Sequence, residues 1–146
     1  MISYHVEGTV GMPDISQGEV SAWVRAVAAS YDRRVGDIAY VFCDDKRILA
    51  VNRQFLQHDY YTDIITFDYS EGRTLSGDLF ISLETVRSNA ELFHTDYPTE
   101  LHRVIIHGIL HLCGINDKKP GEREMMEAAE DKALQMRLDM LKGKDA

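Results

Sequence analysis

Two histidines four residues apart are the side chains in this sequence best placed to do chemistry. His107 and His111 lie in an apolar run that ends at Gly114. An α-helix turns by about 100° per residue, so residues four apart share one face of the helix, one turn above the other. Two imidazole nitrogens in this position can bind one metal ion. The spacing therefore predicts a metal site on a helix.

A carboxylate follows the histidines closely enough to join them. Gly114 is suited to end the helix, because glycine adopts the left-handed conformation at little cost, and Asp117 comes three residues later. The chain can then turn back toward the same ion. Two histidines and one carboxylate leave a fourth position open for water, as in catalytic zinc sites. We expect one Zn²⁺ at His107, His111 and Asp117, with another divalent metal as an alternative.

The same helix has a simpler interpretation. Residues 101–113 are apolar on nearly every face, as in a helix that is buried in a protein core. Both histidines would then be core residues that need buried hydrogen-bond partners. The glycine stop signal and the carboxylate after it favour the metal site over this alternative.

Further candidate site residues lie directly before two of the predicted strands. Asp78 precedes a short apolar run and is a candidate general base, or a partner that orients one of the histidines. A carboxylate in a turn before a strand is an equally good explanation. Thr62 and Asp63 precede another strand, where side-chain bonds to backbone amides are the favoured explanation.

Two more residues have side chains that could contact an aromatic ring or an anionic group of a ligand. His58 lies beside aromatic residues that can stack on an unpaired base, but the residues alone favour an ordinary surface loop. Lys118 directly follows Asp117, so its ammonium group can face a phosphate near the metal, although a solvated surface lysine is the favoured explanation.

The hydrophobic pattern predicts the elements that position these residues. Strands are expected at residues 2–10, 38–43, 64–69 and 79–82, the last two as an antiparallel hairpin. Helices are expected at about 17–31, 46–55, 84–93, 98–113 and 122–141, with Ser16 and Asp44 as caps of the first two. This order predicts one α+β domain over residues 1–146, in which a mixed sheet of about four strands packs against about five helices, with the metal helix central.

Composition limits the class of protein. The chain has 146 residues, of which 45% are apolar and 27% charged, as in a globular domain. No apolar run approaches the ~20 residues of a membrane span, and no signal peptide is visible. Cys43 and Cys113 do not suggest a disulfide framework, so we expect reduced thiols in the cytoplasm. The net charge of -8 argues against binding nucleic acid through bulk charge but allows a small basic cleft.

Three blocks in order between residues 51 and 117 carry a family resemblance. They are Val51-Asn52 with Thr62-Asp63-Ile64-Ile65-Thr66-Phe67, then Ser76-Gly77-Asp78-Leu79-Phe80-Ile81-Ser82, then His107-Gly108-x-Leu110-His111-Leu112-x-Gly114. Together they resemble the YbeY family, the single-strand-specific endoribonucleases of bacterial rRNA maturation. The resemblance implies a zinc-dependent endoribonuclease that acts at the 3′ end of small-subunit rRNA and in ribosome quality control. It also implies RNA and the small ribosomal subunit as partners.

The sequence departs from the family pattern at two positions. The third zinc ligand of the family is a histidine, and Asp117 stands in its place. Aspartate can also bind zinc. Because a carboxylate oxygen is a harder ligand than an imidazole nitrogen, manganese becomes a more reasonable alternative metal. The family also has an arginine shortly before the stretch that begins at Thr62-Asp63, where this chain has Leu56. Arg53, one helical turn earlier, is the candidate replacement for contact with RNA.

Three functions follow from these residues. The first is metal-assisted hydrolysis of RNA by an activated water. The second is a metal-dependent hydrolase of another substrate, such as a peptide. The residue after His107 is Gly108 and not the glutamate base of H-E-x-x-H peptidases, which counts against a peptidase. The third is a non-catalytic ribosome-associated factor with a structural zinc.

Overall fold

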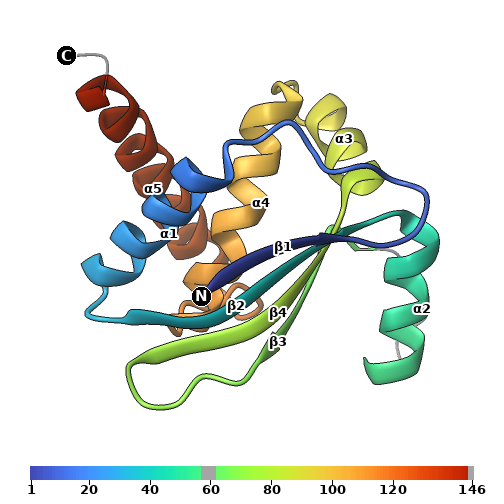
Figure 1. Ribbon diagram of the computed structural model, residues 1–146, viewed down its shortest axis with the longest axis horizontal. Helices are drawn as coiled ribbons and strands as arrows, with labels where there is room; N and C mark the ends of the chain where they lie inside the picture. The colour runs from blue at the N-terminus through green and yellow to red at the C-terminus, as the bar shows by residue number, and fades with distance from the viewer. Residues whose placement is uncertain (57–61, 145–146) are drawn as a thin grey trace.

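The computed structural model describes residues 1–56 and 62–144 and confirms the α+β prediction. In these residues four strands form one mixed sheet, and five helices cover its two faces (Figure 1). The elements in chain order are β1 Ile2–Val6, α1 Gln17–Ser30, β2 Arg34–Cys43, α2 Asp45–Leu56, β3 Ile64–Asp68, β4 Thr74–Ser82, α3 Leu83–Leu92, α4 Tyr97–Leu112 and α5 Glu122–Lys144.

The sheet has the strand order β1-β2-β4-β3. The strand β2 pairs in parallel with β1 and with β4, so it lies inside the sheet, as its apolar sequence predicts. The strands β3 and β4 form the expected antiparallel pair, with Phe67 opposite Asp78. Parallel neighbours need long connections, and α1 supplies the one between β1 and β2.

Several element ends differ from the sequence prediction. The strands β2 and β4 begin at Arg34 and Thr74, earlier than the apolar runs at 38 and 79, because their polar first residues pair with each other. Backbone hydrogen bonds make this pairing without apolar side chains. The strand β1 ends at Val6 instead of residue 10, since Gly8 with φ +85° turns the chain. The helix α5 continues to Lys144, beyond the expected end at 141.

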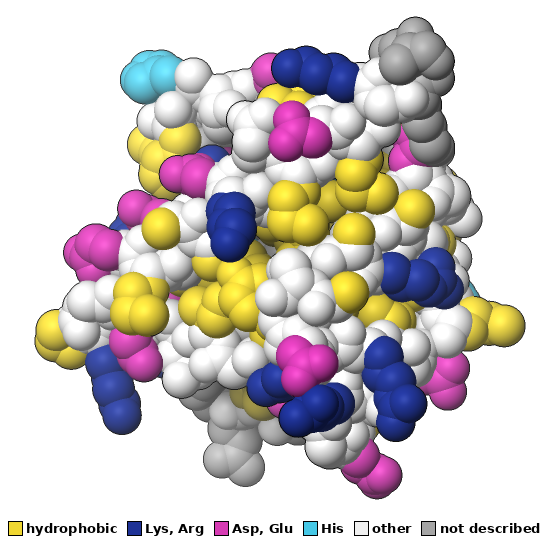
Figure 2. Space-filling view, turned by 90° about the vertical axis from the view of Figure 1, so that its left-hand side faces the viewer, with side chains coloured by type: hydrophobic (Ala, Val, Ile, Leu, Met, Phe, Trp, Pro, Cys, Tyr) yellow, Lys and Arg dark blue, Asp and Glu magenta, His cyan; other side chains and the backbone are white. Residues whose placement is uncertain are grey.

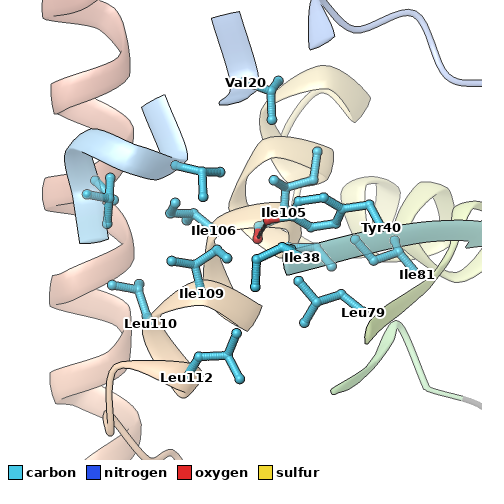
Figure 3. Close-up of a cluster of buried hydrophobic side chains, with 14 of the residues drawn as sticks. Val20, Ile38, Tyr40, Leu79, Ile81, Ile105, Ile106, Ile109, Leu110 and Leu112 are labelled. Carbon is cyan, nitrogen blue, oxygen red and sulfur yellow. Dashed lines mark hydrogen bonds between the residues drawn. The ribbon is translucent and has the colours of Figure 1, made fainter. Parts of the chain in front are cut away.

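The main hydrophobic core lies between the sheet and the central helix α4. Ile105 and Ile109 of α4 pack toward Tyr40 and Leu79 of the sheet, as Figure 3 shows, and all four are fully buried. The Tyr40 hydroxyl donates to the backbone oxygen of Ile105 at 3.0 Å, which satisfies a polar group inside this core. The predicted central position of the helix is therefore confirmed.

The C-terminal helix α5 is fixed to the rest of the fold by a buried indole. Trp23 of α1 donates from Nε1 to the backbone oxygen of Ala133 at 2.8 Å. Met126 and Ala133 of α5 are buried in the same core. Figure 2 shows the side of the molecule where α1 and α5 lie, with hydrophobic side chains among interspersed cations and carboxylates. This side therefore carries no large region of one charge.

A smaller core lies on the opposite face of the sheet. Cys43, Ile48, Val51 and Ile65 form it, so α2 packs across the sheet from α4 (Figure 1). Asp44 caps α2 as predicted, since its Oδ1 accepts from the backbone N–H of Arg47 at 2.8 Å. Within the described residues, no helix has the length and apolar character to cross a membrane.

Candidate metal and catalytic site

The histidine pair lies on α4, whose ends are specified by local sequence. Asp96 caps the first turn through Thr99, and Pro98 occupies an early position where its missing N–H costs nothing. Gly108, beside His107, lets the helix approach the sheet closely. A Cβ on Gly108 would lie 2.8 Å from Leu79 Cδ2 and 3.0 Å from Ile64 Cδ1. A larger side chain at this position, such as the glutamate base of a peptidase, would have to displace Leu79.

The end of α4 turns Asp117 back toward His107. Gly114 has φ +97°, and its N–H bonds the oxygen of His111 at 3.0 Å, while the N–H of Ile115 bonds the oxygen of Leu110 at 3.1 Å. This pair of bonds is a Schellman motif, which reverses the chain after a helix. Asp117 Oδ2 consequently lies 3.4 Å from His107 Nε2. The predicted approach of these two residues is present in the structure.

The His107 side chain opens into a cavity that is lined by residues from several elements. It has a volume of about 720 Å³, and titratable side chains from the start of β3, from α4 and α5, and from the turn after α4 line it. These are Asp63, Glu100, Arg103, His107, Asp117 and Glu130, together with Arg123, Glu127 and Asp131, which also lie on α5. Acidic groups dominate this set, which suits a cation.

Glu130 holds the second nitrogen of His107. Glu130 Oε2 lies 2.7 Å from His107 Nδ1, and Glu130 Oε1 lies 2.9 Å from Arg103 Nη1. An ionised carboxylate only accepts hydrogen bonds, so Nδ1 carries the proton when the imidazole is neutral. The Nε2 lone pair then faces Asp117. Glu130 itself is only 7% exposed.

The electrostatics of the cavity follow from burial and charge. Burial raises the pKa of Asp63, and the neighbouring His107 opposes this only in part. Burial alone would lower the pKa of His107, but the hydrogen bond and charge of Glu130, with the charges of Asp117 and Asp63, raise it instead. Removal of these carboxylates would therefore make His107 less basic.

The positions of His107 and Asp117 fit a metal ion, but the position of His111 does not. Two atoms about 2.0–2.2 Å from a tetrahedral zinc ion lie about 3.3–3.5 Å apart, which matches the distance from His107 Nε2 to Asp117 Oδ2. A histidine that binds a metal usually donates its other nitrogen to a carboxylate, as His107 does. His111, however, does not line the cavity, and no three potential ligands within the described residues gather closely enough to hold an ion.

Comparison with known proteins decides the family. The family model described as Endoribonuclease YbeY matches residues 11–137. The chain belongs to the YbeY family. A Bacteroides fragilis protein named Endoribonuclease YbeY is 70% identical over 136 residues, which are 93% of this chain and 97% of the relative. A protein of the same name from Phocaeicola vulgatus is 72% identical over 134 residues, covering 92% of this chain and 96% of the relative.

A solved structure agrees on the YbeY-like fold. A Thermotoga maritima protein known from its solution structure superposes with a TM-score of 0.66 and 24% identity, covering 99% of this chain and 93% of that one. At this identity the likeness supports the fold alone.

The structure does not bring Asp78 to the YbeY-family histidines. On β4, Leu79 faces α4, whereas Phe80 packs on the α2 side of the sheet. Side chains alternate along a strand, so Asp78 points to the α2 side, where the Tyr69 hydroxyl donates to it at 3.4 Å. This placement does not support the expected action of Asp78 as a base or as a partner of the histidines.

The expected RNA contacts are dispersed. Arg53 lies in the last turn of α2, across the sheet from the cavity, and Leu56 at the same end of the helix is 40% exposed. Lys118 is exposed directly after Asp117. His58 lies outside the described residues. Of these residues, only Lys118 adjoins a residue that lines the cavity.

Three residues of the site were not predicted from the sequence. Asp63 lines the cavity, although turn chemistry was the favoured explanation for it. Arg103 and Glu130 form the pair that holds His107, yet neither belongs to a recognised block. The available signal was weak: Arg103 lies one turn before His107 on the same helix, and Glu130 is a carboxylate in an otherwise amphipathic helix.

Proposed function

We propose that this chain is a metal-dependent endoribonuclease that cleaves single-stranded RNA by attack of water on a phosphodiester. The observation that carries the proposal is the match, over more than nine-tenths of the chain, to relatives named Endoribonuclease YbeY. We further propose action in the cytoplasm, at the 3′ end of small-subunit rRNA and in ribosome quality control, with the small ribosomal subunit as partner. The family resemblance supports these finer assignments.

His107 and Asp117 would hold the metal, with His111 as the third ligand. When bound, a zinc ion lowers the pKa of a water molecule and polarises a phosphoryl oxygen. The hydrogen bond from His107 Nδ1 to Glu130 keeps Nε2 directed toward Asp117. Direct participation of His111 requires its side chain to turn toward the cavity.

Asp63 is the cavity carboxylate that we assign as proton acceptor. It enters from β3, opposite α4, and the burial that raises its pKa brings it closer to the range of an efficient general base. Phe93 also lines the cavity and is 57% exposed, so its ring is available to stack on an unpaired base. Arg123, on the same rim, is available to contact a phosphate.

Elemental mass spectrometry on the purified chain tests the metal. We expect about one zinc per chain in the wild type, and its loss in both His111→Ala and Asp117→Ala. Retention of zinc in either variant would exclude that residue as a ligand, and a metal-free wild type purified without chelator would contradict the metal site.

Cleavage of matched single-stranded and double-stranded RNA tests the activity. We expect cleavage of the single strand only, abolished in Asp117→Ala while circular dichroism shows an intact fold. Zinc-loaded wild type that leaves both RNAs intact would instead favour the non-catalytic factor with a structural metal.

A further inference from the structure

We propose that Glu130 is a positioning residue that fixes the proton of His107 on Nδ1 and thereby presents Nε2 to the cavity. The inference rests on the proposed function, because it assigns Nε2 as the atom that binds the metal. The bonds of Glu130 go to His107 and Arg103 and not to the proposed ligand Asp117, so it acts through His107.

The contacts of Glu130 leave it little freedom. Its two oxygens are divided between two donors, with Oε2 at 2.7 Å from His107 Nδ1 and Oε1 at 2.9 Å from Arg103 Nη1. The side chain is 9% exposed, so water does not compete effectively for either oxygen. A carboxylate presents a separate acceptor oxygen to each of these two donors.

Arg103 fixes the carboxylate in turn. Its Nη1 bonds Glu130, and its Nη2 lies 2.8 Å from Asp131 Oδ1, so the guanidinium of α4 holds two adjacent residues of α5. Because the Arg103 guanidinium bonds Oε1 of Glu130, Oε2 is the oxygen left for His107. The pair therefore links the docking of α5 to the orientation of an imidazole on α4.

A neutral imidazole free in water prefers the proton on Nε2, which would block metal binding by that nitrogen. The bond to Glu130 reverses the preference, because Nδ1 must donate to the carboxylate. In known sites the partners that orient metal-binding histidines change metal affinity by about 10- to 100-fold.

The variant that tests this is Glu130→Gln. Glutamine keeps the shape but replaces one oxygen by an NH₂ group that donates, so it cannot present an acceptor at both oxygen positions of Glu130. Glu127→Gln is the matched control, since Glu127 lies one turn away on α5, lines the same cavity and is 58% exposed in a pair with Arg123. Both variants remove one negative charge from the cavity.

The first readout is the His107 tautomer in the metal-free chain, from ¹⁵N chemical shifts at alkaline pH. We expect the Nδ1–H form in the wild type and in Glu127→Gln, and a shift toward Nε2–H in Glu130→Gln. An unchanged tautomer in Glu130→Gln would overturn the proposal. This readout needs neither metal nor RNA, so its failure is distinct from failure of the proposed nuclease function.

The second readout is Zn²⁺ affinity, measured by competition with a chromogenic chelator. We expect Glu130→Gln to bind about 10- to 100-fold more weakly than the wild type, and Glu127→Gln to bind as the wild type does. Equal weakening in both variants would attribute the effect to cavity charge and overturn the assignment to Glu130.

Arg103→Lys covers the case in which Glu130→Gln fails to fold. It retains a cation beside Glu130 but removes the two-pronged hold on Glu130 and Asp131. We expect a smaller shift of the His107 tautomer in the same direction. A wild-type tautomer in a folded Arg103→Lys variant would overturn the part of the proposal in which Arg103 fixes the carboxylate, because Glu130 would then orient His107 without it.

Discussion

Asp63 and Asp78 separate two roles that look alike in the sequence. Both are aspartates at or near a strand entrance, but Asp63 lines the cavity and Asp78 points across the sheet to Tyr69. We predict that Asp63→Asn lowers the rate of the cleavage step by about 10²- to 10⁴-fold, because an amide cannot accept the proton. Single-turnover cleavage of a single-stranded RNA by the metal-loaded chain measures this rate.

Asp78→Asn is the control for that experiment. We expect it to cleave at the wild-type rate, since its side chain lies on the face of the sheet opposite α4. A slow Asp78→Asn with a normal Asp63→Asn would reverse the assignment of the base.

Local spacing made half of the site predictable. His107, Gly114 and Asp117 lie within one helical end, where helix periodicity and a glycine cap determine the geometry. Glu130 reaches His107 only through the docking of α5, and no spacing rule connects residues 23 positions apart. Asp63 likewise depends on the packing of α4 on the sheet.

The loop after β1 and the first turn of α2 share one carboxylate, that of Asp44. Asp44 Oδ1 accepts from Arg47 N, and its Oδ2 accepts from both the N–H and the hydroxyl of Thr9 at 2.9 Å. We predict that Asp44→Ala lowers the free energy of unfolding by about 1–2 kcal/mol, the range for a lost helix cap. Urea unfolding with an unchanged slope measures this.

Cleavage should be insensitive to the same change. Because α2 packs across the sheet from the cavity, the folded Asp44→Ala variant should cleave RNA at the wild-type rate per folded molecule. Unchanged stability in Asp44→Ala would mean that water replaces the cap and the Thr9 bonds without cost.

Element types were easier to predict than element ends. The apolar positions of residues 38–43 indicate an interior strand, but the start of β2 at Arg34 depends on pairing with Thr74 of β4. The local sequence around a polar residue does not indicate whether a neighbouring strand is long enough to pair with it. Caps such as Ser16 are local, and its bond to the N–H of Glu19 was predictable for that reason.

The pH dependence of the whole fold should include a contribution from a buried histidine. His102 packs against Trp23, and its Nδ1 donates to the backbone oxygen of Pro98 at 2.6 Å. Burial lowers its pKa below the usual value of 6.5, and the charge of Arg137 acts in the same direction. The unfolded chain therefore binds a proton at a higher pH than the folded chain does.

Stability should consequently fall as the pH drops below about 6.5, by up to about 1.4 kcal/mol per pH unit for this one proton. We predict that His102→Gln removes this part of the slope, as measured by urea unfolding of metal-free protein at several pH values. The exposed His94→Gln is the control. Equal slopes for the wild type and His102→Gln would contradict the prediction.

The bond between Trp23 and Ala133 gives the molecule a built-in optical reporter. Trp23 is the single tryptophan of the chain, and its ring is 1% exposed where α5 docks. Release of α5 would expose the indole to water and shift its fluorescence to longer wavelength. Glu130 lies on the same helix. The emission of Trp23 therefore reports whether the cavity is assembled, without an added label or substrate.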